Sequence, residues 1–198
     1  MTDAEHPSAR AELAAITQDR ILRGLAALLR RSSDEVTFEL LAAESGVPQR
    51  TLYRHFANKE VLFVAFWGWL NLSIEMPERP ADPERLVAHI PALFAAFDRD
   101  EPLVRAMLHS PHGRSIRLAH AAARRDKFEA ALRPVTMALG ESQKQRLLAA
   151  VTALCSASGW ETMKDNWGLS GSAAADAAQW AVKALIDEAR GQTRTNAG

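Results

Sequence analysis

The feature of this 198-residue sequence that most restricts its fold is the near absence of β-strand signals. No segment shows sustained alternation of apolar and polar residues, and the hairpin dipeptides Asn-Gly and Asp-Gly do not occur. The residues Ala, Leu, Arg, Glu and Gln, which favour helices, dominate instead. We therefore predict an all-α protein with about nine helices, whose ends are marked by caps, glycines and prolines.

The predicted helices follow one another with short connections. Residues 1–17 are polar and are predicted to form a flexible N-terminal arm, and residues 191–198 a disordered tail. The stretch MPERPADPER is the clearest internal break, and Pro91 should kink the helix that contains it. The predicted helical segments are about 18–31, 37–45, a short one from Pro48, 58–74, one from Asp82 through Phe97, 102–109, 115–138, 143–166 and 172–190.

A tight turn between two short helices is predicted around Gly46. Thr37 can cap the first of these helices through its side chain, and Gly46 is a typical stop signal at a helix C-terminus. Pro48 fits the first position of the next helix, because its missing N–H is not needed there. The predicted arrangement is therefore helix, turn, helix.

The segment GVPQRTLYRHFANKE, residues 46–60, concentrates polar and cationic side chains between two apolar runs. One α-helix fits the major groove of duplex DNA, which is about 12 Å wide. Side chains of its first turn can then reach base edges: glutamine suits adenine, arginine suits guanine, and the threonine methyl group suits thymine. We predict that Gln49, Arg50 and Thr51 read the DNA sequence.

The remaining side chains of this segment have other predicted roles. Leu52 and Phe56, four residues apart, would pack inward, whereas Tyr53 and His55 would reach phosphate oxygens. Lys59 lies in the first turn of the following helix, where free N–H groups and the helix dipole attract a phosphate. The alternative is an exposed turn with solvated charges. The agreement between the turn, the helix phase and the inward pair favours DNA binding.

The segment TFELLAAESGVPQRTLYRHFANKEVL closely resembles the N-terminal signature of the TetR family of one-component transcriptional regulators. The family core G-V-x-x-x-T-L-Y-x-H-F-x-x-K-E is matched throughout, and the resemblance covers about residues 18–66. It implies that phosphates are contacted by Thr37 and Tyr53 and that the DNA backbone is fixed by His55 and Lys59. It also implies base contacts from Gln49, Arg50 and Thr51.

Two departures from the family pattern affect the details of DNA contact. The position before Gln49 is often a helix-capping serine in this family and is Pro48 here. The glycine that commonly closes the first helix is replaced by RRSSDE. With these departures, the resemblance implies a three-helix DNA-binding domain over 18–66, followed by a helical ligand-binding and dimerisation domain over 67–190.

A homodimer is expected, because operators normally bind two recognition helices about 34 Å apart. The last two predicted helices carry stripes of apolar and small residues that could form a four-helix bundle with a second subunit. The alternative is that these stripes pack within one subunit. The predicted interface residues are Leu147, Val151, Leu154, Ala174, Ala177, Ala178, Trp180, Ala181 and Leu185.

The middle of the chain is rich in large apolar side chains, which either form a core or line a pocket. A small apolar or aromatic effector bound there would push on the helix 58–74, which begins next to Lys59. The two recognition helices would then move apart and release a palindromic operator, as in a repressor. The predicted pocket residues are Trp67, Phe94, Phe97, Met107, Phe128 and Trp160.

Other functional classes are disfavoured. The spacing of His109, His112 and His120 places at most two of them on one helical face, so a zinc site is disfavoured. Cys155 lies on an apolar stripe without a neighbouring base, which favours an inert buried thiol. No phosphate loop, dinucleotide fingerprint or G-x-S-x-G motif occurs. We predict no enzymatic activity and no cofactor, and the remaining alternative is an effector-independent architectural DNA-binding protein.

Composition adds limits on location and partners. The net charge is zero, so attraction to DNA must come from local clusters of charge. The single cysteine excludes an internal disulfide, and the start MTDAEHPSAR lacks the features of a signal peptide. The longest apolar run, VLFVAFWGWLNL, is shorter than the ~20 residues that cross a bilayer. We expect a cytoplasmic protein with no membrane partner.

Overall fold

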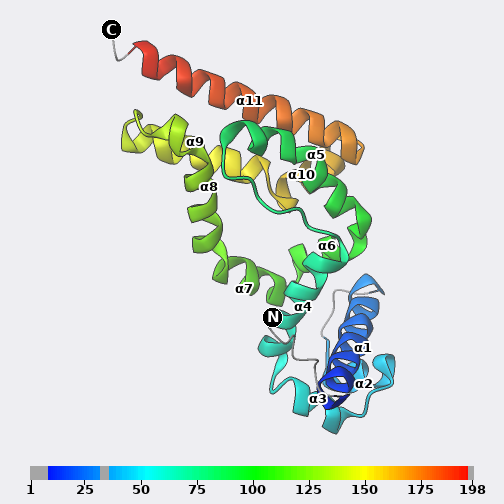
Figure 1. The fold of residues 1–198 in the computed structure, drawn as a ribbon. Helices are drawn as coiled ribbons and strands as arrows, with labels where there is room; N and C mark the ends of the chain where they lie inside the picture. Colours follow the sequence, from blue (N-terminus) through cyan, green and yellow to red (C-terminus); the bar gives the residue numbers. More distant parts are fainter. Residues whose placement is uncertain (1–8, 32–35, 196–198) are drawn as a thin grey trace, which may run out of the picture.

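The computed structural model describes residues 9–31 and 36–192 in full and the backbone of 193–195. Within these residues the chain is all-helical and has no strand, which confirms the predicted fold class (Figure 1). There are eleven helices in this described part, against about nine predicted. They are α1 (Ala9–Arg31), α2 (Phe38–Ser45), α3 (Gln49–His55), α4 (Lys59–Ser73), α5 (Pro83–Arg99), α6 (Glu101–His109), α7 (Pro111–Ala119), α8 (Ala121–Thr136), α9 (Glu141–Leu154), α10 (Ala157–Trp167) and α11 (Gly171–Thr195).

The helices form two groups along an elongated molecule (Figure 1). Helices α1, α2 and α3 gather at one end, and α11 lies at the other. α4 connects the two groups, since it contacts α1 on one side and α7 on the other. α11 packs along α5 and also contacts α8, α9 and α10. We call α1 to α3 with the start of α4 the N-terminal unit, and α5 to α11 the C-terminal helices.

Several helices begin at side-chain caps close to their predicted starts, and the cap at Thr37 was predicted. Thr37 and Asp82 accept hydrogen bonds from the backbone N–H groups three residues later and so start α2 and α5. Asn58 caps α4 in the same way. Pro48 differs slightly from its predicted place, because it is the cap residue of α3 and not its first helical residue. These local signals determine the boundaries of the N-terminal unit.

Helix α5 continues through Pro91. The proline has no N–H, so the carbonyl of Val87 one turn earlier loses its partner within the helix. Gln179 of α11 donates its side-chain N–H to this carbonyl at 3.0 Å. A side chain from the neighbouring helix therefore replaces the missing bond.

The predicted single helix over 115–138 is wrong. The chain forms α7 and α8, which are separated at His120. α7 packs against α4 and α6, whereas α8 packs against α5 and α9. Arg117 of α7 donates to the carbonyls of Met107 and Leu108, at 2.5 and 2.8 Å, and so ties α7 to the end of α6. Different packing partners on the two sides separate these helices where no glycine or proline is present.

The predicted single helix over 143–166 is also wrong, because α9 ends before Cys155 and α10 begins after Ser156. The Ser156 hydroxyl accepts a hydrogen bond from the Gly159 N–H at 3.0 Å. A Cβ atom on Gly159 would lie 2.5 Å from the carbonyl oxygen of Ala153. The turn therefore needs glycine at this position, and Ser156 with Gly159 was the signal that sequence reasoning missed.

The helices at both ends are longer than predicted. Residues 9–17 belong to α1 although they were assigned to the flexible arm, and residues 191–195 belong to α11 although they were assigned to the tail. The first turns of α1 are exposed and carry Leu13 and Ile16, each 65% exposed. The rest of both predictions, residues 1–8 and 196–198, lies outside the described residues.

Candidate nucleic-acid interface

The turn between α2 and α3 is held from two sides. Gly46 has a φ of 63°, a left-handed conformation that glycine adopts without steric cost. Arg20 of α1 donates hydrogen bonds to the carbonyls of Ser45 and Gly46, at 2.7 and 3.1 Å. A Cβ atom at position 46 would lie 2.5 Å from the guanidinium of Arg20. The cation of α1 therefore caps the C-terminus of α2, and the left-handed φ at position 46 favours glycine there.

Helices α1 and α2 approach closely beneath this turn. A Cβ atom on Gly24 would lie 2.8 Å from the Cβ atom of Ser45. The buried Ser45 hydroxyl donates to the carbonyl of Leu41 at 2.6 Å and accepts from the N–H of Val47 at 3.3 Å. These contacts fix the conformation of the turn and therefore the direction in which α3 begins.

Helix α3 has only seven residues, too few to be stable alone, so packing must hold it in place. Leu52 is fully buried, and Phe56 and Val47 are 2% and 4% exposed. The carbonyl of Pro48 accepts hydrogen bonds from Thr51 and Leu52 at 2.8 and 3.1 Å, which closes the first turn. The inward pair predicted from the sequence is thus part of the core.

The residues predicted to read bases lie on the accessible side of α3. Gln49 and Arg50 are exposed, and Thr51 is half-buried. Tyr53 is 52% exposed, and its ring meets Phe38 edge to face at a centroid distance of 4.6 Å. This contact joins α3 to the start of α2.

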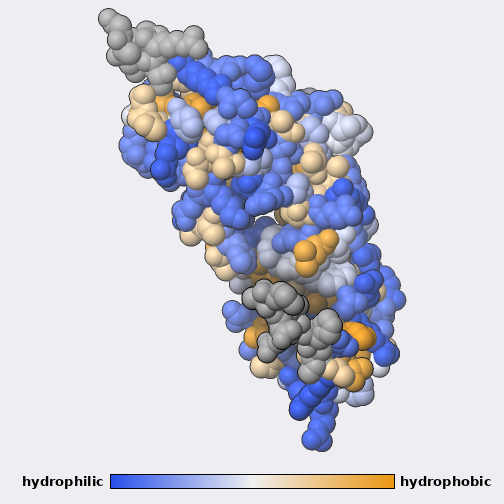
Figure 2. Space-filling model, in the orientation of Figure 1, coloured by the Kyte–Doolittle hydropathy of each residue, from blue (hydrophilic) through white to orange (hydrophobic). Residues whose placement is uncertain are grey.

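The remaining predicted contacts lie at the same end of the molecule. Thr37 caps α2, His55 is the last residue of α3, and Lys59 is the first residue of α4; all three are half-buried. The tip of this end is hydrophilic in the view of Figure 2. The structure therefore places the seven predicted residues along α3 and at the neighbouring ends of α2 and α4.

Two arginines of this region had no predicted role. Arg54 is exposed on α3 and adds a third positive charge to the segment that holds Arg50 and Lys59. Arg20 of α1 donates hydrogen bonds to the carbonyls of the turn. The position of Arg54 in the cationic segment was a usable signal, whereas the role of Arg20 depends on the packing of α1 against α2.

A short helix that is anchored on one face, exposed on the other and preceded by a glycine turn defines a helix-turn-helix DNA-binding domain. Residues 21–66 match the family model described as bacterial regulatory proteins, tetR family. The protein is therefore a DNA-binding transcriptional regulator with the helix-turn-helix domain of the TetR family. A comparison of the whole sequence with curated proteins gave no significant match.

A small cavity of about 40 Å³ lies between α4 and the C-terminal helices. Three of the predicted pocket residues, Trp67, Phe97 and Met107, line it. The other three, Phe94, Phe128 and Trp160, are buried to within 1% and belong to the packed core. Further lining residues that sequence reasoning did not identify are Leu70, Asn71, Ile74, Met76, Val104, Leu108, Arg117 and Ala157.

The predicted dimer residues differ in whether a second subunit could reach them. Leu147, Val151, Ala174 and Ala178 are buried inside the subunit, because α11 packs on α5 and α9, so they are not accessible to a second subunit. Trp180 is 75% exposed. The half-buried residues of the set are Leu154, Ala177, Ala181 and Leu185. Trp167, at the end of α10, is 79% exposed and was not predicted.

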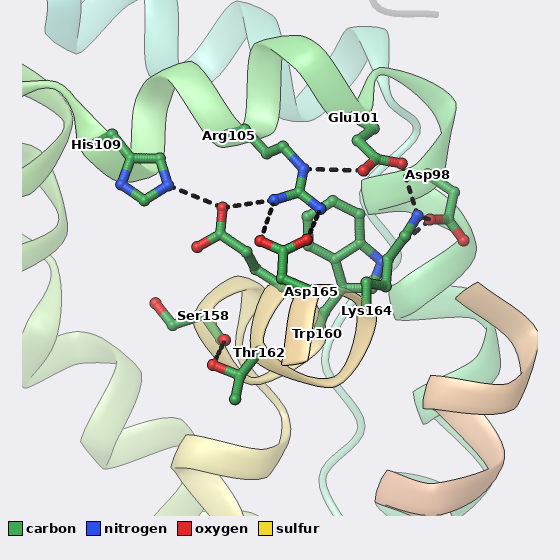
Figure 3. A network of polar contacts seen from close by, with 10 residues as sticks. Asp98, Glu101, Arg105, His109, Ser158, Trp160, Thr162, Lys164 and Asp165 are labelled. Carbon is green, nitrogen blue, oxygen red and sulfur yellow. Dashed lines mark hydrogen bonds and ion pairs between the residues drawn. The ribbon is translucent and has the colours of Figure 1, made fainter. Parts of the chain in front are cut away.

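An ionic network joins α10 to α6 (Figure 3). Arg105 of α6 contacts Glu161 and Asp165 of α10 at 3.0 and 2.6 Å, and Glu101 of its own helix at 2.8 Å. The Asp165 and Glu101 carboxylates raise the pKa of Arg105 far above its usual value. Lys164 of α10 bonds Glu101 at 2.6 Å. α6 and α10 are therefore held as one pair.

The corner between α5 and α6 contacts both parts of the molecule. Asp98 accepts hydrogen bonds from Lys164 and from the Trp160 indole N–H, at 2.7 and 3.0 Å. Two residues later, Asp100 accepts hydrogen bonds from Arg30 of α1, the shortest at 2.5 Å. This corner links α10 to the N-terminal unit.

The three histidines of the disfavoured metal site lie in different surroundings. His109 contacts Glu161 at 2.9 Å, His112 stacks on Phe63 and His120 stacks on Trp67. Among residues 9–31 and 36–192, no cluster of potential ligands could hold a metal ion. In the same part of the chain, no helix is long and apolar enough to span a bilayer.

Proposed function

We propose that this regulator is a repressor that binds a palindromic operator as a homodimer and is released by a small effector. The observation that carries the proposal is α3, whose inner face is fixed by Leu52 and Phe56 while Gln49 and Arg50 are exposed. The proposed division of labour places DNA binding in residues 18–66 and effector binding with dimerisation in residues 67–190. We expect the protein to act in the cytoplasm.

Base contacts are proposed for Gln49, Arg50 and Thr51, and contacts to the DNA backbone for the other four predicted residues. Each well-formed pair between a side chain and a base edge discriminates by about 1–3 kcal/mol. The backbone contacts supply affinity that depends on salt and not on sequence. The backbone contacts are Thr37, Tyr53, His55 and Lys59.

The proposed dimer forms through the outer faces of α10 and α11. Tryptophan is frequent among the residues that anchor protein interfaces. Trp180 on α11 and Trp167 on α10 are exposed and available for such a role. The small residues Ala177 and Ala181 beside Trp180 would let a partner helix approach closely. A stable interface of this kind should bury more than about 1,000 Å² in total.

The proposed effector site is the cavity between α4 and the C-terminal helices. Pockets for drug-sized ligands are typically about 300–1,000 Å³, so the cavity of about 40 Å³ must enlarge when an effector enters. Trp67 and Leu70 of α4 line it, and α4 begins at Lys59 in the DNA-binding surface. Enlargement would displace α4, and a coupling of about 1–3 kcal/mol would suffice for release.

The small cavity also favours a second candidate function, a dimeric architectural DNA-binding protein without an effector. Selection of bound duplexes from a random pool tests DNA binding and symmetry together. The repressor proposal predicts a palindrome with half-sites about one helical turn apart. Selection of a single half-site, or of no sequence, would refute it. Loss of binding on addition of an effector separates the regulator from the architectural protein.

A further inference from the structure

An arginine with a partly unsatisfied guanidinium lies in the segment between α4 and α5. This segment, residues 74–82, crosses the C-terminal helices before α5 begins (Figure 1). The guanidinium carbon of Arg79 lies 4.2 Å from the centre of the Phe128 ring of α8. Its Nη1 is buried, and no hydrogen-bond acceptor contacts it within the described part of the chain. A buried charged donor without an acceptor is costly, which suggests that an acceptor is supplied by a ligand.

The groups around Arg79 do not provide that acceptor. Burial is the main cause that lowers the pKa of Arg79, and the charge of Arg124 on α8 lowers it further. The anionic form of Cys155 would be a partner, but burial raises the pKa of this thiol to about 11, so it stays neutral near pH 7. Burial and the charge of Arg79 lower the pKa of His89, which favours a neutral imidazole. The surroundings therefore lack a compensating anion.

Other arginines of the molecule show how different this site is. Arg30, Arg99 and Arg105 each contact a carboxylate, at 2.5, 3.2 and 2.6 Å. No ion pair of this kind is found for Arg79 or Arg124 within residues 9–31 and 36–192. Within the described residues, Arg20 and Arg117 also lack a carboxylate but donate to backbone carbonyls, whereas the buried Nη1 of Arg79 has neither kind of acceptor.

A third arginine, near Arg124, lies at the wall of the cavity. Arg117 lines the cavity and donates to two carbonyls at the end of α6. Burial lowers the pKa of Arg117, and the charge of Arg124 lowers it further, as it does for Arg79. Met76 of the crossing segment and Ala157, two residues after Cys155, line the same cavity. The crossing segment therefore carries both Arg79 and a residue of the cavity wall, and the charge of Arg124 acts on Arg79 and on Arg117 of that wall.

We propose that the effector of this regulator is an apolar monocarboxylate. Its carboxylate accepts hydrogen bonds from Arg79 and Arg124, and its apolar body enlarges the cavity lined by Trp67, Phe97 and Met107. The proposal rests on the proposed effector-responsive function and names the chemical class of ligand. Aromatic and aliphatic monocarboxylates both fit this description, and the test distinguishes between them.

The test measures binding of matched acids and amides to the full-length protein by calorimetry and thermal shift. The probes are 2-naphthoate with 2-naphthamide and decanoate with decanamide. At least one acid should bind, and it should bind about tenfold or more tightly than its amide, since only the acid pairs with the cations. Whichever of the two acids binds shows whether the apolar part of the effector is aromatic or aliphatic. No acid binding, or equal binding of acid and amide, overturns the proposal.

Three variants locate the site. Arg79→Met and Arg124→Met should weaken acid binding about tenfold and change amide binding by less than about threefold. Arg125→Met is the matched control, because Arg125 is the exposed neighbour of Arg124, and both ligands should bind it unchanged. Unliganded Arg79→Met should melt at the same or a higher temperature than wild type, because an unpaired buried cation is removed. Wild-type acid affinity in Arg79→Met overturns the proposal.

The same titrations separate this inference from the proposed function. If the acid binds through Arg79 but DNA binding persists, the site stands and the effector role fails. If an amide releases DNA while the acid does not bind, the effector role stands and the carboxylate site is overturned.

Discussion

The two regions of this protein fix their functional side chains in different ways. In the N-terminal unit, a turn glycine, a cap and an arginine from α1 place a seven-residue helix, and the side chains assigned to DNA project from it. In the C-terminal helices, the large apolar residues fill a core, and the cavity between this core and α4 has a volume of about 40 Å³. The proposed DNA-binding surface is thus preformed, whereas the proposed effector site beside α4 must enlarge to admit a ligand.

The largest effects are expected when one fully buried side chain in each region is replaced by alanine. Trp160→Ala should lower the free energy of unfolding by about 3–5 kcal/mol and Leu52→Ala by about 2–5 kcal/mol, because both side chains are fully buried. Only Leu52→Ala should also weaken DNA binding by the folded protein, since Leu52 positions α3. Urea unfolding and binding titrations at low temperature measure both quantities. Equal loss of DNA affinity in the two variants would contradict the distinction between the regions.

The next comparison is made within the DNA-binding surface. Arg50→Ala should relax preference at one operator position at a cost of about 1–3 kcal/mol, since Arg50 is assigned to a base. Lys59→Ala should weaken all sequences alike and reduce the salt slope by about one, since Lys59 is assigned to a phosphate. Titrations of matched and mutated duplexes at several salt concentrations distinguish the two. Equal effects of the two substitutions would refute the assigned roles.

Two glycines test whether the turn is as constrained as its geometry indicates. Gly46→Ala should destabilise the protein by about 1 kcal/mol or more, because position 46 has a positive φ and adjoins Arg20. Gly68→Ala is the control, since no atom lies within 4 Å of its added Cβ and the site is inside α4. It should stabilise by about 0.5–1 kcal/mol. Thermal unfolding compares the two, and a neutral Gly46→Ala would show that the turn tolerates a side chain.

The smallest expected effect is on the stability of the protein at acidic pH. Lys164 and Arg105 lower the pKa of Glu101 below its ordinary value of 4.5 in the folded protein. Its contribution to stability is therefore present above pH 4.5 and is lost as the pH falls through the lower folded-state pKa. Unfolding followed between pH 6 and pH 3 should show a shallower loss of stability in Glu101→Gln than in wild type. The same slope in both proteins would mean that the pairing of α6 with α10 adds no acid sensitivity.

The sequence predicted the N-terminal unit well because its signals are local. Thr37, Gly46 and Asn58 fix helix ends through contacts within a few residues, and the structure agrees with each. The separate helices on either side of His120 could not be predicted in this way. Their directions depend on contacts of α7 with α4 and of α8 with α5, which join residues far apart in the chain.

The stripes of the last helices show the same limit. A helical stripe predicts that one face is buried but not whether its partner belongs to the same subunit. Ala174 and Ala178 face α5 and α9, whereas Trp180 on the same helix is exposed. Helical spacing indicated burial correctly, and only the tertiary contacts identify the partner. The unpaired guanidinium of Arg79 likewise depends on which side chains do not reach it.

The most direct test of the central claim, that α3 enters the major groove, is methylation interference on a selected duplex. Methylation of guanine N7 blocks the major groove, and methylation of adenine N3 blocks the minor groove. The proposed function predicts loss of binding at guanine N7 in two clusters about 34 Å apart on one face of the DNA. Interference confined to adenine N3, or none at any position, would contradict it.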